Sequence, residues 1–140
     1  MTYKFLPDVA LADIAFEAES ETLDGLFQSC ALAVTDVMVD PKSLGSRVVK
    51  EFHLDSADPD RLLYDFLTEL IIAKDVDSLL FGEFEVKVSR QGRSLAVVAK
   101  GEPIDRARHM LRNDVKAVTM HMFGIRKDGG KLRTVVVLDI

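Results

Sequence analysis

Hydrophobic residues recur every three or four positions in two long segments, which predicts two amphipathic helices. The first is expected at residues 23–39, with Thr22 as its N-cap and Pro41 after its end. The second is expected at residues 59–74. It begins at Asp58-Pro59, an acidic N-cap followed by proline at the first helical position. Each helix therefore presents one apolar face to a core.

Hydrophobic and polar residues alternate in shorter segments, which predicts β-strands. These cover residues 13–19, 48–54, 84–88 and 95–99. Two further segments, residues 115–125 and 132–140, are apolar on both faces and are expected to be central strands, covered on each side. Met120 and Met122 are expected to fill the core from the first of these strands. Residues 101–113 break the pattern and are expected to be mostly loop.

These elements together predict an α+β sandwich, in which two long helices pack on one mixed or mostly antiparallel sheet. No linker or shift in composition divides the 140 residues, so residues 1–140 are expected to form a single domain. Hydrophobic residues make up 48% and charged residues 29%, as in compact soluble proteins. No apolar run has the length of a signal peptide or a membrane anchor, so we expect a cytoplasmic protein without membrane contact.

The charge balance changes this picture little but excludes one class of function. The chain has 18 Lys and Arg against 23 Asp and Glu, a formal net charge of -5. We therefore expect no broad basic face for direct nucleic-acid binding. The single cysteine, Cys30, excludes an internal disulfide and a cysteine-based zinc site. It lies on the apolar stripe of the first predicted helix, where a thiol is expected to be inert.

The histidines form no metal-ligand spacing in the sequence. They are His53, His109 and His121. For each we favour a structural, hydrogen-bonded role, because histidine is intermediate in burial. The one local basic cluster surrounds His109 and comprises Arg106, Arg108 and Arg112. We favour a solvated loop here over a site for an acidic partner or a phosphate.

Three charged residues stand in otherwise apolar strands: Asp13, Lys116 and Asp139. An acid inside or at the end of an apolar strand costs free energy unless it is exposed, hydrogen-bonded or bound to a cation. Ile140 follows Asp139 and would add the oxygens of a terminal carboxylate. Carboxylates without histidine or cysteine suit Ca²⁺, Mg²⁺ or Mn²⁺ rather than zinc. From the residues alone, ordinary strand-end acids remain the favoured interpretation and a metal site the alternative. Lys116 is either a strand-end charge or a functional ammonium.

Ten short segments stand out in order along the chain, and the most specific of them lie in the C-terminal third. They are Tyr3-Lys4-Phe5-Leu6, Ala12-Asp13-Ile14, Thr22-Leu23, Leu26-Phe27, Leu62-Leu63-Tyr64-Asp65-Phe66-Leu67-Thr68-Glu69-Leu70, Phe84-Glu85-Val86, Gly101-Glu102, His109, Val115-Lys116-Ala117-Val118-Thr119-Met120-His121 and Val137-Leu138-Asp139-Ile140. Taken together in this order, these segments resemble the archease family over essentially the whole chain.

The resemblance implies a non-enzymatic activator of the tRNA-splicing RNA ligase, an enzyme that joins RNA ends with GTP and Mn²⁺. The activator would promote guanylylation of the ligase and its multiple turnover. The resemblance also implies a divalent metal site, commonly calcium, formed by Asp13, Asp139 and the terminal carboxylate of Ile140. Magnesium and manganese are the alternative metals. The functional lysine of the family corresponds to Lys116.

One motif departs from the family pattern. Family members read His-Thr-Ala-Asp at the first motif, where this chain has Ala10-Leu11-Ala12-Asp13. The metal site is then weaker or completed differently, with Asp8 as a further candidate ligand. Two other functions stay open. One is a metal-dependent hydrolase or transferase that uses Asp13, Asp139 and His121, although no nucleophile is recognisable. The other is a general chaperone or adaptor, although the sequence shows no large exposed apolar stripe.

Overall fold

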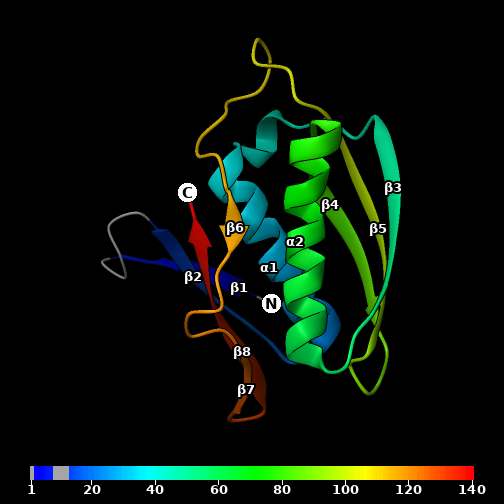
Figure 1. Ribbon diagram of the computed structural model, residues 1–140, viewed down its shortest axis with the longest axis vertical. Helices are drawn as coiled ribbons and strands as arrows, with labels where there is room; N and C mark the ends of the chain where they lie inside the picture. The colour runs from blue at the N-terminus through cyan, green and yellow to red at the C-terminus, as the bar shows by residue number, and fades with distance from the viewer. Residues whose placement is uncertain (1, 8–12) are drawn as a thin grey trace.

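Two antiparallel sheets enclose two long helices in a computed structural model, which describes residues 2–7 and 13–140 (Figure 1). The helices are α1 (Leu23–Met38) and α2 (Pro59–Asp77), with a short 3₁₀ turn at Pro41–Ser43. One sheet has the order β1 (Thr2–Leu6), β2 (Asp13–Ser20), β8 (Lys131–Asp139) and β6 (Ala117–Val118), and β7 (Ile125–Asp128) also pairs with β8. The other sheet has the order β3 (Val48–Asp55), β5 (Ser94–Pro103) and β4 (Leu79–Val88).

Both helices begin at the caps that the sequence predicts. The Thr22 hydroxyl accepts a hydrogen bond from the backbone N–H of Gly25 at 3.1 Å, at the start of α1. The Asp58 carboxylate accepts one from the backbone N–H of Arg61 at 2.8 Å, at the start of α2. These bonds satisfy backbone donors that have no partner inside the helix. At the other end of α2, Ser78 adopts a left-handed conformation with φ of 55° and terminates the helix.

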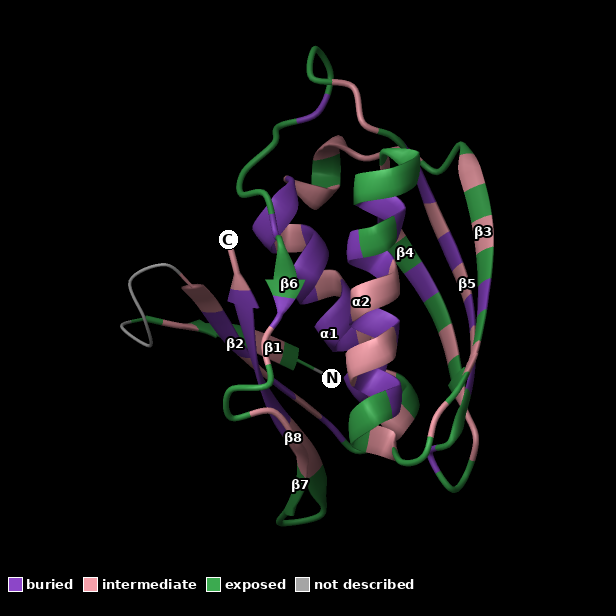
Figure 2. Ribbon diagram, in the orientation of Figure 1, coloured by how far each residue is buried: buried purple, intermediate pink, exposed green. Residues whose placement is uncertain are grey.

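The core lies between the two sheets and is built around both helices (Figure 2). Phe27 of α1 stacks on Phe66 of α2, with ring centroids 6.2 Å apart. Phe66 also meets Phe84 of β4 edge to face at 6.3 Å. α1 contacts β1, β2 and β8 on one side and β4 on the other. The first helix therefore joins the two sheets through one continuous core.

The predicted α+β class is confirmed, with a refinement of the sheet. The strands form two sheets with the helices between them, where the sequence predicted one sheet covered by two helices. Alternation along a strand indicates which face is buried but not which strands pair, so it does not distinguish these arrangements. The N-terminal strand β1 was not predicted; it pairs with β2 at the edge of the larger sheet. Within the described residues, no helix has the length and hydropathy needed to span a membrane.

The expectation of one long central strand at residues 115–125 is wrong. Only Ala117–Val118 pairs with β8 there; the chain then leaves the sheet and returns as β7. Met120 and Met122, expected in the core, are 60% and 56% exposed. Met122 has φ of 57°, which a continuous strand does not allow. The last strand is central as predicted, because β8 has neighbours on both sides and residues 134–138 are buried.

Replacing Asp58 with alanine is expected to lower the free energy of unfolding by about 1 kcal/mol. The change removes the side-chain acceptor of the Arg61 N–H and the negative charge near the N-terminus of α2. Asp58→Asn keeps a capping oxygen and is the matched control. Urea unfolding of the three proteins measures the effect. Equal stability of wild type and Asp58→Ala would show that this cap does not stabilise the fold.

Candidate functional site

Three strand ends meet at one edge of the larger sheet and bring Asp13, Lys116 and Asp139 together. β2 runs antiparallel to β8, and the register places Asp13 opposite Asp139. On the other side of β8, Ala117 is paired with Asp139. The backbone N–H of Lys116 donates a hydrogen bond to the carbonyl oxygen of Asp139 at 2.7 Å. Figure 1 shows the result, with the end of β8 lying between β2 and β6.

Asp13 and Asp139 share the face of the sheet that points away from the helices. Directly paired residues of antiparallel strands project to the same face, and successive residues alternate between faces. The next residues inward, Ile14 and Leu138, belong to the main core beside the helices. The two acids are therefore on the outer face, and both are partly exposed. Like charges directly opposite one another destabilise a sheet, and a bound cation relieves that repulsion.

No basic side chain neutralises this acidic pair within the described part of the chain. No Lys, Arg or His nitrogen there lies within 4.0 Å of either carboxylate, and the Lys116 side chain is itself exposed. Further along the same face, Arg133 pairs with Glu17 at 3.6 Å and with Glu19 at 3.1 Å. A small apolar cluster lies between these ion pairs and the acidic pair and comprises Leu6, Ala15, Val135 and Val137. The acidic pair is thus separated from the ion pairs that Arg133 makes.

The donors at this edge suit a hard divalent cation. Carboxylate oxygens are the ligands of Ca²⁺, Mg²⁺ and Mn²⁺, and Ca²⁺ takes six to eight oxygens. Among the residues described, no three His, Cys, Asp or Glu side chains lie close enough together to hold a metal ion. Asp13 and Asp139 would therefore supply only two carboxylates to a metal ion, and Ile140 follows Asp139 in the chain. Asp8 and residues 10–12, where the sequence departs from the family motif, lie outside the described residues.

The histidines do not complete a catalytic arrangement. His121 was predicted within a strand but lies in the exposed turn after β6, where its backbone N–H donates to the Thr119 hydroxyl at 3.2 Å. It does not form a metal-binding group with Asp13 and Asp139 in the described structure. His53 is exposed on β3 and lies 3.8 Å from Glu51. The described part of the chain therefore does not bring together the three residues of the hydrolase hypothesis.

A buried carboxylate, Glu102, organises a second polar cluster at the end of β5. It is 1% exposed and accepts hydrogen bonds from Gly45 N–H at 2.8 Å and from Arg108 at 2.8 and 2.9 Å. The His109 ring accepts the Asp105 N–H at Nδ1, so its proton is on Nε2 and is donated to Glu102. His109 is thus a buried, hydrogen-bonded histidine, as the sequence predicts for it.

Lys74 connects helix α2 to the segment that carries Lys116. Its ammonium bonds to the carboxylates of Asp75 and Asp114 and to the carbonyl oxygen of Val115. Burial lowers the pKa of Lys74, but the hydrogen bonds to Asp114 and Asp75 outweigh it and raise the pKa above its ordinary value. The sequence pattern did not single out this residue. The residue could have been found because a lysine one turn after Ile71 falls on the apolar face of α2.

Cys30 contributes no nucleophile. Its side chain is fully buried in the core between α1 and its neighbours. Burial raises the pKa of the thiol well above its ordinary value, so the reactive thiolate does not form at neutral pH. The expected inert role of this cysteine agrees with its surroundings.

Acidification should destabilise the protein through Glu102. Hydrogen bonds from His109, Gly45 and Arg108 lower the pKa of this carboxyl from 4.5 to about 2. A depressed pKa contributes stability that is complete above pH 4.5 and is lost as the pH falls toward 2. Glu102→Gln is expected to be less stable at neutral pH and to show a flatter pH dependence in that window. Urea unfolding from pH 7 to pH 2 measures both, with exposed Glu85→Gln as control. Parallel curves for wild type and Glu102→Gln would contradict the assignment.

Comparisons with known proteins agree with this arrangement of strands and helices. The archease proteins of Pyrococcus abyssi and Methanothermobacter thermautotrophicus are 34% and 36% identical to this chain over 132 and 131 residues, covering 92% of it and 93% of each relative. The solution structure of Methanobacterium thermoautotrophicum protein 1598 has a TM-score of 0.83 and 34% identity, over 99% of this chain and 98% of that one.

A Thermotoga maritima crystal structure, described as an archease and possible chaperone, shares the fold with a TM-score of 0.67 and 20% identity, over 96% of both chains. The sequence model of the Archease protein family matches residues 3–140, from the first strand to the acidic end of the last. Together with the identity to curated archeases, this match shows that the chain belongs to the Archease protein family.

Proposed function

We propose that this archease is a non-enzymatic activator of the GTP- and Mn²⁺-dependent tRNA-splicing RNA ligase. The observation that carries the proposal is the meeting of Asp13, Asp139 and Lys116 at one sheet edge. These are the positions to which the family resemblance assigns the metal ligands and the functional lysine. The net charge of -5 also favours action on a protein partner over direct binding to RNA.

In the proposed mechanism, Asp13 and Asp139 hold a divalent cation, calcium in the first instance, with Ile140 contributing its terminal carboxylate. The cation would supply positive charge beside the nucleotide phosphates of the ligase. Lys116 is exposed and its ammonium has no carboxylate within 4.0 Å among the described residues. Its side chain is therefore available to donate hydrogen bonds to phosphate oxygens. The backbone bond from Lys116 to Asp139 joins the segment that carries the lysine to the end of β8, where the acidic pair lies.

The proposal is tested with purified archease and the RNA ligase of the same organism. Ligase, RNA ends, GTP and Mn²⁺ are combined, and covalent guanylate on the ligase and joined RNA are followed over several turnovers. When the ligase is present at a lower concentration than the RNA ends, we expect archease to increase the joined RNA per ligase molecule severalfold. Equal product with and without archease would contradict the proposal.

Two controls separate the remaining functions. Archease alone is incubated with phosphate esters and nucleotides, where turnover would favour a hydrolase. An unrelated aggregation-prone protein is refolded with archease, where protection equal to that given to the ligase would favour a general chaperone. The proposal predicts neither result.

A further inference from the structure

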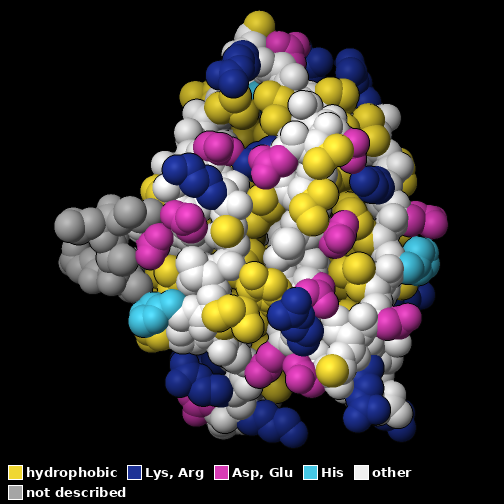
Figure 3. Space-filling model, viewed as in Figure 1, with side chains coloured by type: hydrophobic (Ala, Val, Ile, Leu, Met, Phe, Trp, Pro, Cys, Tyr) yellow, Lys and Arg dark blue, Asp and Glu magenta, His cyan; other side chains and the backbone are white. Residues whose placement is uncertain are grey.

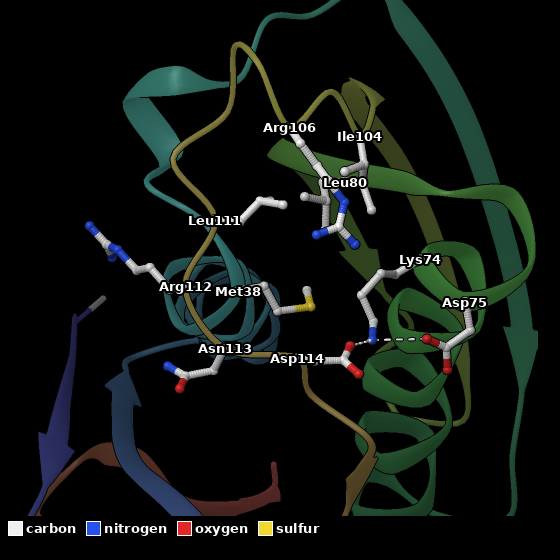
Figure 4. Close-up of a pocket in the computed structure, with 10 residues that line it drawn as sticks. All are labelled: Met38, Lys74, Asp75, Leu80, Ile104, Arg106, Leu111, Arg112, Asn113 and Asp114. Carbon is white, nitrogen blue, oxygen red and sulfur yellow. Dashed lines mark hydrogen bonds and ion pairs between the residues drawn. The ribbon is translucent and has the colours of Figure 1, made fainter.

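A pocket of about 400 Å³ lies between the C-terminal ends of α1 and α2, beneath the loop that leads to β6 (Figure 4). In Figure 3, hydrophobic side chains gather around basic and acidic groups below the uppermost loop. The size is at the lower end of the range for small-molecule sites.

The pocket has an apolar wall. Met38 of α1, Leu80 of β4 and Leu111 of the loop line it. Met38 and Leu80 are 5% and 2% exposed, whereas Leu111 is 39% exposed. In Figure 4 the side chains of Met38 and Leu111 both extend toward the centre of the pocket. This surface is suited to a hydrocarbon group, because covering it removes apolar area from water.

Among the residues that the structure describes, one cation of the pocket has no anionic partner. The three N–H donors of Lys74 are used by Asp75, Asp114 and the Val115 carbonyl oxygen. Arg112 likewise pairs with the carboxylate and the carbonyl oxygen of Asp36 and points away from the pocket in Figure 4.

Arg106 differs from these two residues. Its guanidinium points into the pocket from the loop above, and no described carboxylate lies within 4.0 Å of it. A guanidinium presents paired donors that match the two oxygens of a carboxylate. Asp75 and Asp114 stand nearby as negative charges. They would repel a doubly charged phosphate more than a singly charged carboxylate.

We propose that this pocket binds a monocarboxylate with an apolar body. The carboxylate pairs with Arg106, and the apolar body packs on Met38, Leu80 and Leu111. The ligand is either a free small acid or the C-terminal residue of a peptide, since both present the same chemistry. This inference is independent of the proposed action on the ligase, because it involves none of the residues of the acidic edge.

The experiment uses the full chain labelled with ¹³C at its methionine methyl groups. Met38 reports from the pocket and exposed Met122 is the internal reference. The probes are N-acetyl-leucine, its neutral amide, phenyl phosphate, and the peptide acetyl-Gly-Gly-Leu with a free C-terminus. We expect the Met38 signal to shift as N-acetyl-leucine is added and the shift to reach a plateau at saturation. The neutral amide should bind at least tenfold more weakly. The peptide arm assigns the source: binding favours a peptide terminus, and no binding favours a free acid.

Arg106→Gln is expected to weaken the binding of N-acetyl-leucine at least tenfold. Arg90→Gln, which removes an exposed arginine from the β4–β5 turn, should change nothing. Arg106 has no ion pair among the described residues, so its replacement should leave the fold intact. An unmoved Met38 signal, equal binding of acid and amide, tighter binding of phenyl phosphate, or unchanged affinity in Arg106→Gln would each overturn the proposal.

Discussion

Replacing Asp139 with asparagine is expected to abolish the stabilisation of the protein by calcium. The metal-free variant should be at least as stable as wild type, because the change removes a like charge directly opposite Asp13. That gain should be no more than about 1 kcal/mol. Wild type at a calcium concentration of 100 times its dissociation constant should gain about 2.7 kcal/mol, which the variant should lack.

Thermal unfolding with and without calcium measures both effects. The matched control is Asp55→Asn, which changes an exposed acid at the end of β3 in the other sheet. This control should keep the full response to calcium. Two outcomes would contradict the metal assignment: a calcium response that persists in Asp139→Asn, or a metal-free variant that is markedly destabilised. The second would indicate that the carboxylate has a structural role.

Replacing Lys116 with methionine is expected to reduce activation of the ligase at least tenfold while leaving the protein folded. The side chain is exposed, and surface substitutions usually change the free energy of unfolding by less than about 0.5 kcal/mol. The backbone bond from Lys116 to Asp139 does not depend on the side chain and should remain. Calcium should therefore still bind, so the variant would separate the role of the ammonium from that of the metal.

Ligase guanylylation and calcium-dependent unfolding are measured on the same preparation of Lys116→Met. Lys127→Met, an exposed lysine on β7 of the same sheet, is the control for loss of a positive charge. Undiminished activation by Lys116→Met would remove this lysine from the mechanism. Equal loss in Lys127→Met would point to net charge rather than to position.

The sequence predicts the helices more fully than the sheets. The caps at Thr22 and Asp58 are local signals, because each acts within three residues of the chain. Strand pairing is not local, so the division into two sheets and the register of Asp13 with Asp139 required the folded structure. The failure at residues 115–125 has a related cause. Exposed methionines there resemble a buried apolar face in the sequence.

The sequence singles out the residues of the candidate site but does not predict their arrangement. Asp13, Lys116 and Asp139 each stand out as charges among apolar neighbours, but the sequence does not show that they meet. β8 brings them together by pairing with β2 on one side and with the segment before and within β6 on the other. The sequence assigned no role to Glu102, which stood only in one of the segments that resemble the family. Its burial depends on partners from Gly45 and from the loop around His109, which no local pattern connects.

In the proposed function, activation of the RNA ligase requires the acidic edge of the larger sheet. Its most direct test is the double variant Asp13→Asn/Asp139→Asn, first shown to be folded. Covalent guanylate and joined RNA are followed through several turnovers with wild type, with the variant and with ligase alone. We expect the double variant to give no more product than ligase alone. Activation by the double variant equal to that of wild type would show that the acidic edge is not required.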